Sequence, residues 1–473
     1  MLAAPKPIIA ANVPGATMST GKPIDPQIVA RFEDQRAPRY TSYPTAPHFT
    51  DAVSGEDYRR LLAALPAEDG LSLYFHIPFC RSMCWYCGCH TKIVASDGPI
   101  HEYLEDLEAE LRMVSAVLPR RLKVQHIHWG GGTPTIMAPR SFGHLMGLLH
   151  RHFDVAPDAE IAIEIDPRRI SDAIGRALGA GGVTRASLGV QSFDPRVQDA
   201  INRVQSFEQT ARVSDALREA GIGSVNVDLI YGLPYQTVAS CESTTARTLE
   251  LKPDQLSVFG YAHVPWLKKH QRLLEEHPLP DAGQRLSQFT AISDKLTESG
   301  YKRIGLDHFA RPEDRLERCL REGKLHRNFQ GYTGDQCSTL LGFGASAIGT
   351  LPDAYVQNSA QIGDYRRRIR SGALAVARGR RLSADDRLRR DVIERIMCDF
   401  RVDLEAVAST HGANARYFAA ELGKLGPLQR DGIVKVDGSV VSIEETYWPL
   451  ARTVASAFDA YLHPGEQRHA RAI

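Results

Sequence analysis

Apolar residues between about 70 and 265 follow two alternating patterns. Short branched and aromatic runs, typical of buried strands, alternate with longer segments whose apolar residues recur at helical spacing, as in 101–118. Connections of this length between strands indicate parallel βαβ units with right-handed crossovers. The six predicted strands cover 72–79, 124–131, 160–167, 185–192, 224–231 and 255–261, and further helices cover 207–220 and 237–251.

This pattern predicts an α/β fold whose sheet is a closed or partly closed barrel. Neither a GxGxxG sequence nor a Walker phosphate loop follows the first strand, which argues against a doubly wound nucleotide-binding sheet. In a parallel barrel the functional side chains come from the carboxyl ends of the strands. Glu164, Gln191 and Asp228 each lie near such an end and are candidates for a site. For Glu164 a salt bridge inside the barrel is the alternative.

The segment before the barrel is aromatic and rich in proline. Residues 37–45 are predicted to be extended, because residues that precede proline are pushed out of the α region. We interpret this segment either as a strap packed on a domain surface or as a cover over an active site. Residues 1–35 have no periodicity and are predicted to be a flexible leader, with Met18 as an alternative start.

The chain after the barrel has the pattern of a second, smaller unit. A helix over 281–300 and a strand over 300–309 come first. A charged helix then begins after Ser383, a predicted N-cap, and residues 433–443 predict a hairpin with an Asp-Gly turn. We predict a leader and strap over 1–50, a barrel with a post-barrel extension over 51–377, and a helical and hairpin domain over 378–473.

Composition and charge exclude several classes of protein. The 473 residues are 43% hydrophobic and 24% charged, and the net charge of +1 gives no reason to expect nucleic acid or an anionic membrane as partner. No apolar run approaches the roughly 18 to 20 residues that span a bilayer. The N-terminus lacks the basic start and long apolar core of a secretory signal. We therefore predict a soluble, cytoplasmic enzyme without a membrane span.

Four of the eight cysteines lie within ten residues, directly after the first predicted strand. Thiolates are soft ligands that suit iron–sulfur clusters and zinc. A four-iron cluster is usually held by four cysteines, so a C-x3-C-x2-C triplet on one loop leaves one iron open to a substrate or cofactor. A zinc site that also uses Cys89 or His90 remains an alternative, and unliganded thiols would be prone to oxidation. The triplet is Cys80, Cys84 and Cys87.

A glycine run, Gly130-Gly131-Gly132, follows the second predicted strand. Consecutive glycines let the backbone approach a ligand closely and present amide donors. A tight strand-to-helix turn would explain the run equally well. Its position beside the cysteine loop in a parallel sheet favours ligand binding.

The cysteine triplet after a strand resembles the radical S-adenosylmethionine (SAM) superfamily. The fuller string Tyr74-x-His76-Ile-Pro-Phe-Cys80-x3-Cys84-x-Tyr86-Cys87-Gly88-Cys89 is similar to that of the oxygen-independent coproporphyrinogen III oxidase family. Segments 38–45, 327–333, 341–348 and 389–403 also resemble this family, so the resemblance covers roughly residues 36 to 460. It implies an incomplete (β/α)6 barrel with a small, mostly helical C-terminal domain.

The resemblance also implies the reaction. The family decarboxylates two propionates of coproporphyrinogen III to vinyl groups without oxygen, which gives protoporphyrinogen IX in heme biosynthesis. A [4Fe–4S] cluster on Cys80, Cys84 and Cys87 would reduce bound SAM to a 5′-deoxyadenosyl radical, and two SAM molecules would be used per product. The electron donor and the electron acceptor are not identified by the sequence, and we expect a monomer.

Residue roles carried over from the family complete the predicted site. Tyr74, Gly131, Glu164 and Ile348 would contact the first SAM. The second SAM would be contacted by Tyr86, Gly132, Thr133, Gln191, Arg203, Asp228 and Ala262. Cys89 is not expected to bind the cluster, and we assign it and Tyr74 to catalysis, Cys89 either in handling the substrate radical or in support of the ligand thiols. Arg39, His308 and Arg327 are hypothesised contacts to the anionic substrate.

Two other functions remain as alternatives. Heme chaperones of the same superfamily share the cluster loop but typically lack the cysteine that corresponds to Cys89. A zinc-stabilised nucleic-acid-binding protein with a winged-helix tail would explain the cysteines and the C-terminal hairpin. The hairpin has no basic cluster, however, so the second alternative is weaker.

Overall fold

The computed structural model describes residues 26–32, 35–66 and 70–462. Most of the predicted leader therefore lies outside the described residues. Its last part corrects the prediction, because Pro26–Phe32 form a helix, α1. No helix among the described residues is long and apolar enough to cross a membrane.

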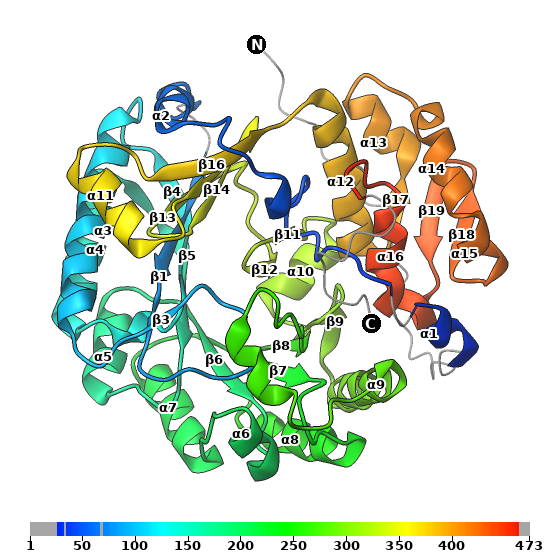
Figure 1. Cartoon of the computed structure of the whole chain (residues 1–473), viewed down its shortest axis with the longest axis horizontal. Helices are drawn as coiled ribbons and strands as arrows, with labels where there is room; N and C mark the ends of the chain where they lie inside the picture. The colour runs from blue at the N-terminus through cyan, green and yellow to red at the C-terminus, as the bar shows by residue number, and fades with distance from the viewer. Residues whose placement is uncertain (1–25, 33–34, 67–69, 463–473) are drawn as a thin grey trace.

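All six predicted barrel strands are present and are parallel neighbours in one sheet (Figure 1). They alternate with helices on the outer side of the curved sheet, as the predicted βαβ units require. The strands are β1 (Leu71–Ile77), β4 (Lys123–Gly131), β5 (Asp154–Ile165), β6 (Arg185–Gln191), β7 (Ser224–Tyr231) and β8 (Gln255–Gly260). The helices are α3 (Gly98–Val117), α4 (Pro139–His152), α5 (Asp172–Ala180), α6 (Pro195–Ala200), α7 (Phe207–Glu219) and α8 (Val238–Glu250).

The sheet continues beyond these six strands at both ends, and the order of its twelve strands does not close on itself. The barrel is therefore incomplete, as predicted. On one side β13 (Thr339–Phe343) is parallel to β1, and β14 (Ile348–Leu351), β15 (Ala354–Asn358) and β16 (Val376–Arg381) follow antiparallel. On the other side the predicted strand 300–309 is two short antiparallel strands, β9 (Lys302–Ile304) and β10 (His308–Ala310). Helices α2 (Gly55–Ala63), α9 (Ala282–Glu298), α10 (Arg315–Arg321) and α11 (Ile362–Arg370) complete this part.

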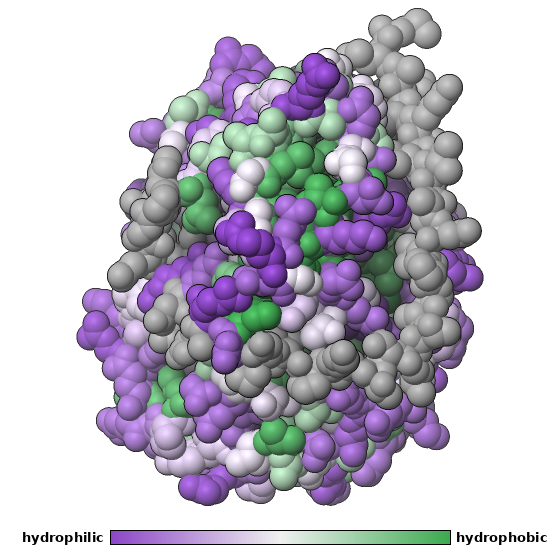
Figure 2. Space-filling model, turned by 90° about the vertical axis from the view of Figure 1, so that its right-hand side faces the viewer, coloured by the Kyte–Doolittle hydropathy of each residue, from purple (hydrophilic) through white to green (hydrophobic). Residues whose placement is uncertain are grey.

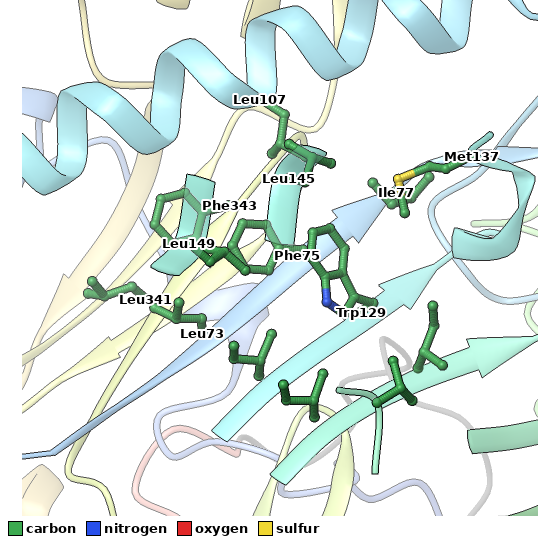
Figure 3. Packing of buried hydrophobic residues seen from close by; sticks show 14 of the residues in the cluster. Leu73, Phe75, Ile77, Leu107, Trp129, Met137, Leu145, Leu149, Leu341 and Phe343 are labelled. Carbon is green, nitrogen blue, oxygen red and sulfur yellow. The ribbon is translucent and has the colours of Figure 1, made fainter. Parts of the chain in front are cut away.

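The core of the barrel packs large side chains between the sheet and its outer helices. Phe75 of β1 stacks on Trp129 of β4 and on Phe343 of β13, with ring centroids 4.3 and 4.9 Å apart. Leu107 of α3 and Leu145 of α4 lie on this cluster (Figure 3). Each fully buried side chain of this kind contributes roughly 1.5–3 kcal/mol to folding. The strands that carry the cysteine loop and the glycine run are thereby fixed relative to each other.

A second hydrophobic cluster holds the C-terminal elements. Ser383 caps α12 (Ala384–Asp399) with a capping box, and the predicted hairpin is β18 (Val434–Asp437) and β19 (Val440–Ile443). β17 (Arg401–Asp403), α13 (Leu404–Thr410), α14 (Ala419–Lys424), α15 (Gly426–Arg430) and α16 (Ala451–Ser456) complete it. Hydrophilic side chains surround a smaller hydrophobic area on the side of the molecule where these elements lie (Figure 2). The three-part division of the chain stays a prediction.

The aromatic segment 37–45 packs as a strap against the C-terminal elements, but the prediction that it is extended is wrong, because Tyr40 has a φ of +47° and bends cover residues 41–44. Tyr40 and Tyr43 are buried in the second cluster. The Tyr40 hydroxyl donates to Asp459 at 3.1 Å, and the backbone N–H of Ala460 donates to the Tyr43 hydroxyl at 2.9 Å. The neighbouring Arg39 side chain points toward the barrel, where it donates to the carbonyl of Gly260 at 3.5 Å. The strap thus connects the two clusters.

A buried acid on α3 ties the helix to the loop between β13 and β14. Glu110 accepts hydrogen bonds from Gly344 N–H at 2.7 Å, Tyr365 OH at 2.8 Å and the Asn358 amide at 2.6 Å. Burial raises the pKa of Glu110 to about 7 even though these donors oppose the shift. Between about pH 4.5 and 7, Glu110 is therefore protonated in the native state and ionised in the unfolded chain.

Stability is consequently expected to fall as pH rises through this window, by up to about 3 kcal/mol at ~1.4 kcal/mol per pKa unit. Glu110→Gln removes the titration, so its free energy of unfolding should depend less on pH between 5 and 7.5. Chemical denaturation at a series of pH values measures this. Glu105→Gln, an exposed acid on the same helix, is the control and should keep the wild-type slope. Equal slopes in all three proteins would contradict the assignment.

Candidate functional site

The cysteine triplet lies on the loop that leaves β1. Pro78 ends the strand, and β2 (Phe79–Cys80) then pairs with β3 (Lys92–Ile93) across the loop. All the cysteines of the loop are free thiols. Zinc would need sulfurs within roughly 4 Å of one another, given a Zn–S distance near 2.3 Å. Among the described residues no group of three or more His, Cys, Asp or Glu side chains converges in this way.

Two guanidinium groups, that of buried Arg203 and that of partly buried Arg168, flank Cys84. Arg203 and Arg168 each place a nitrogen 3.4 Å from its sulfur, and both also pair with Asp166. Two guanidinium groups this close to the sulfur can balance the negative charge of a thiolate-bound cluster. Cys80 lies 3.3 Å from the Thr133 hydroxyl at the end of the glycine run. The donor set and its cationic surroundings therefore fit an anionic iron–sulfur cluster.

Three side chains near the short helix η3 (Lys269–Leu274) hold the backbone of the cysteine loop in place. Gln271 donates to the carbonyl of Tyr86 at 2.9 Å and Lys268 donates to that of Cys89 at 2.8 Å. His270 lies 2.8 Å from the carbonyl of Cys87. These contacts could not be predicted from the sequence, because backbone acceptors leave no signal in it.

The glycine run packs directly on the start of the cysteine loop. Gly132 N–H donates to the carbonyl of Ile77 at 2.8 Å, and Thr133 N–H donates to that of Phe79 at 2.9 Å. Gly131 has a φ of +116°, which favours glycine. A Cβ at Gly132 would lie 2.6 Å from the carbonyl oxygen of Phe79. The glycines are thus required for the close approach of two backbones.

Gly132→Ala is accordingly expected to push the glycine run away from the cysteine loop. Overpacking of this kind costs about 1–3 kcal/mol. Both the midpoint of thermal unfolding and the iron content after anaerobic reconstitution should fall. Gly88→Ala is the matched control, because a Cβ at Gly88 of the same loop meets nothing within 4 Å. Wild-type stability and iron content in the Gly132 variant would contradict this packing argument.

The residues predicted for the first SAM gather on neighbouring strands. Glu164 of β5 accepts from Gly131 N–H at 3.0 Å and lies 3.2 Å from His128. Burial disfavours its anion, but these hydrogen bonds outweigh burial and lower its pKa below the usual value. Tyr74 of β1 is paired with Gly342 of β13, and Gly342 packs against the backbone of Ile348. Gly342 therefore lies between the two predicted SAM contacts. The residues predicted for the first SAM therefore include an ionised carboxylate, Glu164, that is hydrogen-bonded to the backbone of the glycine run at Gly131.

A histidine next to this set is held neutral. The Tyr74 hydroxyl lies 3.0 Å from His76 Nδ1, and His76 Nε2 lies 2.9 Å from the carbonyl of His90. Burial lowers the pKa of His76 to about 4. Its ring therefore links Tyr74 to the cysteine loop through hydrogen bonds and brings no positive charge.

Among the residues predicted for the second SAM, Gln191 and Arg203 lie close together and have unsatisfied buried atoms, whereas Asp228 lines the cavity inside the barrel. Gln191 Oε1 and Arg203 Nε have no hydrogen-bond partner among the described residues. Such atoms cost free energy unless a ligand satisfies them. Burial raises the pKa of Asp228, although Ser187 donates to it at 2.9 Å. The amide of Gln271 bridges the carbonyls of Tyr86 and Ala262.

The hypothesised substrate cations surround a carboxylate that the sequence analysis had not considered. His308 lies 2.8 Å and Arg327 lies 3.6 Å from Asp307, and Arg39 acts on the same group electrostatically. Burial would raise the pKa of Asp307, but Arg327 and His308 reverse this and lower it well below the usual value. Arg39 and Arg327 therefore already share one anion, to which the ring of His308 is also hydrogen-bonded.

Two hollows occur near or on the barrel. A polar cavity of about 120 Å³ runs inside the sheet and is lined by Glu164, Asp228 and His308 among others. A larger groove of about 530 Å³ lies on the outer surface between α4 and α5 and has no residue of the site in its wall. The cavity inside the barrel is the one that adjoins the candidate residues.

The comparisons with known proteins agree with this geometry. The Radical SAM superfamily model matches residues 74–246. The oxygen-independent coproporphyrinogen III oxidase of Bradyrhizobium diazoefficiens is 54% identical over 446 residues, which cover 94% of this chain and 99% of that protein. The oxidase of Escherichia coli K12 is 42% identical over 426 residues, with 90% and 93% covered. The solved structure of coproporphyrinogen III oxidase (HemN) from Escherichia coli, described as a radical SAM enzyme, has a TM-score of 0.86 at 41% identity and covers 90% of this chain and 98% of that one.

Proposed function

This chain belongs to the oxygen-independent coproporphyrinogen III oxidase family of radical SAM enzymes, and from that membership we infer what each part of its barrel does. The enzyme oxidatively decarboxylates two propionates of coproporphyrinogen III to vinyl groups and gives protoporphyrinogen IX. Its cofactors are a [4Fe–4S] cluster and SAM. The identity of 54% to a named oxidase over nearly the whole of both chains carries this conclusion.

We propose that Cys80, Cys84 and Cys87 hold the cluster. When bound, the cluster and SAM supply the 5′-deoxyadenosyl radical that abstracts hydrogen from the substrate. Arg203 and Arg168 each place a cationic group 3.4 Å from the sulfur of Cys84, where they would offset the negative charge of the bound cluster. The side chains around η3 keep the loop from moving, because each holds a carbonyl of it.

The first SAM, in this proposal, lies against Tyr74, Gly131, Glu164 and Ile348. Glu164 is the natural partner for a cationic amino group, because its lowered pKa keeps it an anion at neutral pH. Gly131 lets that group approach, since its own N–H already orients the Glu164 carboxylate. Glu164 and Gly131 would thereby bind and orient SAM, and neither residue would need to gain or lose a proton.

A second SAM is proposed at the other set, Tyr86, Gly132, Thr133, Gln191, Arg203, Asp228 and Ala262. The unpartnered Gln191 Oε1 and Arg203 Nε support this assignment, because a ligand with donors and a carboxylate would satisfy both. Two reacting propionates also require two equivalents of SAM per product. The number bound at one time is measured by equilibrium dialysis with labelled SAM.

The role of Cys89 is proposed to lie in catalysis and not in cluster binding. Its thiol donates a hydrogen bond to Cys87, which lowers the pKa of Cys87 to about 6. It can therefore support a ligand thiolate or meet the substrate radical. Cys89→Ser is expected to keep the iron content and lose most turnover.

Substrate binding is proposed to use Arg39, His308 and Arg327. Arg39 and Arg327 would exchange part of their pairing with Asp307 for substrate propionates, because two guanidinium groups face this one carboxylate. We also expect a cytoplasmic monomer that takes electrons from a separate donor, passes them to a separate acceptor and binds no nucleic acid.

An anaerobic assay with coproporphyrinogen III, SAM and dithionite tests the function, with porphyrins resolved by chromatography after oxidation. The family assignment predicts protoporphyrin, preceded by a monovinyl intermediate. The alternative of a heme chaperone predicts an intact cluster and stable heme binding without decarboxylation.

A further inference from the structure

A tyrosine of the outer helix α3 joins β1 to β13 at the point where their backbone pairing stops. The two strands are paired as far as Phe75 and Phe343. Directly beyond this pair, the Tyr103 hydroxyl donates to the carbonyl of His76 at 2.8 Å and accepts from the N–H of Ala345 at 2.8 Å. A hydroxyl can do both because it has one donor and two acceptor lone pairs. Tyr103 therefore fixes the distance between the end of β1, where the chain enters the cysteine loop, and the turn after β13.

The turn over residues 344–347, which joins β13 to β14, packs tightly on the end of β1. Gly344 has a φ of +94°, and a Cβ there would lie 2.6 Å from the carbonyl oxygen of His76. Ile348, a predicted contact of the first SAM, directly follows this turn. Tyr74, another predicted contact, precedes His76 by two residues on β1. The predicted first SAM site thus takes a residue from each of the two segments that Tyr103 joins.

Glu110 holds the same turn from the same face of α3, because it lies about two helical turns after Tyr103. It accepts from Gly344 N–H at 2.7 Å and from the Asn358 amide at 2.6 Å, and that amide also donates to the carbonyl of Gly344 at 3.0 Å. Burial of a carboxyl group costs free energy, and an apolar side chain would pack α3 on the sheet equally well. The contacts of Glu110 are therefore explained better by the position of the turn than by stability.

The far end of the cysteine loop is hydrogen-bonded to the same region. His76 Nε2 lies 2.9 Å from the carbonyl of His90, and His90 Nε2 contacts the carbonyl of Ala360 just after β15. The N–H of Ser346 in the turn donates to the carbonyl of Ser359 at 2.9 Å. The cysteine loop, the 344–347 turn and the end of β15 are therefore linked by hydrogen bonds, so that a shift of the turn changes its spacing from the loop.

We propose that Tyr103 and Glu110 are positioning residues for SAM binding, because together they hold the 344–347 turn at a fixed distance from the cysteine loop. Neither side chain touches SAM in this proposal, since both are buried on the outer helix and act through backbone groups of β1 and of the turn. A ligand held by Tyr74 on one segment and Ile348 on the other binds more tightly when both segments are preorganised. The proposal rests on the proposed function, from which it takes the first SAM site.

The test compares Tyr103→Phe with a matched control in the reconstituted full-length enzyme. The substitution removes the hydroxyl but keeps the ring, which packs edge-on against Phe79 at 5.3 Å. Tyr301→Phe is the control, because Tyr301 belongs to the same hydrophobic cluster and its hydroxyl also donates to a backbone carbonyl, that of Pro253 before β8. Both variants should unfold at a lower temperature than the wild type. SAM affinity, measured by equilibrium dialysis, should fall about tenfold in Tyr103→Phe and stay unchanged in the control.

Hydrogen–deuterium exchange of the 344–347 turn gives a readout that is independent of activity. The amides of Gly344 and Ala345 should exchange faster in Tyr103→Phe, because local opening of the turn becomes easier, and at the wild-type rate in Tyr301→Phe. Glu110→Gln is a second variant in case Tyr103→Phe does not fold. Its single amide oxygen cannot accept from all three donors that face Glu110, so weaker SAM binding and faster exchange of the turn are expected again.

Wild-type SAM affinity in the folded Tyr103 and Glu110 variants would overturn the proposal. An equal loss of affinity in Tyr301→Phe would overturn it too, because the effect would then be one of general stability. Faster exchange of the turn without weaker SAM binding would show that the two side chains hold the turn but do not position the cofactor. Failure of the reconstituted wild type itself to bind SAM would instead refute the proposed function, on which the proposal rests.

Discussion

Cys84→Ala is expected to yield an enzyme with little iron and at least about 10³-fold less decarboxylation, or ~4 kcal/mol in activation free energy. Among the proposed ligand thiols, Cys84 has the most specific surroundings, since Arg168 and Arg203 both contact it. In the proposed site its removal leaves one iron without a protein ligand and the two guanidinium groups without a sulfur contact. Iron analysis, visible absorption and turnover with dithionite measure the effect.

Cys241→Ala is the matched control for this experiment. Cys241 is also buried, but it stands alone on α8, where a thiol acts as a small apolar side chain. Its variant should keep wild-type iron and activity. A Cys84 variant that retained both would show that the cluster is held elsewhere.

Glu164→Gln is expected to weaken SAM binding by about 2 kcal/mol, or roughly 30-fold, and to lower turnover at limiting SAM. The substitution keeps the size of the side chain but removes the charge that would hold an amino group. Because the pKa of Glu164 is lowered, wild-type affinity should be independent of this group above its ordinary pKa and should fall only when the pH drops through the lowered value. Equilibrium dialysis over pH 5 to 8 measures the loss of affinity in the variant, and over this range the contribution of Glu164 in the wild type should not change with pH.

The same substitution four residues earlier on β5 controls for general effects. Glu160 lies near the middle of the strand, where it is already paired with Arg185 and Arg315. Glu160→Gln should therefore leave SAM affinity unchanged even if it lowers stability. Equal losses of affinity in the two variants would mean that Glu164 supports the barrel and does not contact SAM.

The six barrel strands could be predicted because parallel strands are buried on both faces and appear in sequence as short apolar runs. The C-terminal hairpin could be predicted from its Asp-Gly turn, and α12 from the cap at Ser383. β13 and β14 were missed because Gly342, Gly344 and Gly349 interrupt the apolar pattern that signals a strand. These glycines allow close packing, since a Cβ at Gly342 would lie 2.7 Å from the carbonyl oxygen of Ile348.

In the candidate site, too, some residues could be predicted from the sequence alone and others could not. The cysteine triplet was predictable from spacing alone, whereas the individual SAM contacts came from the family resemblance. Asp307 could not be foreseen, because nothing in its local sequence signals that Arg39 and Arg327 come from distant segments to meet it. The carbonyl contacts of Lys268 and Gln271 depend on the same kind of long-range approach.

Transfer of a hydrogen atom from the substrate propionate to 5′-deoxyadenosine is the most direct test of the proposed reaction. Coproporphyrinogen III deuterated at the β-carbons of its propionates is turned over anaerobically with SAM, and the 5′-deoxyadenosine formed is analysed by mass spectrometry. A barrel that positions SAM against the propionates predicts one deuterium in each 5′-deoxyadenosine and two methionines per protoporphyrinogen. Vinyl formation with unlabelled 5′-deoxyadenosine would contradict the account.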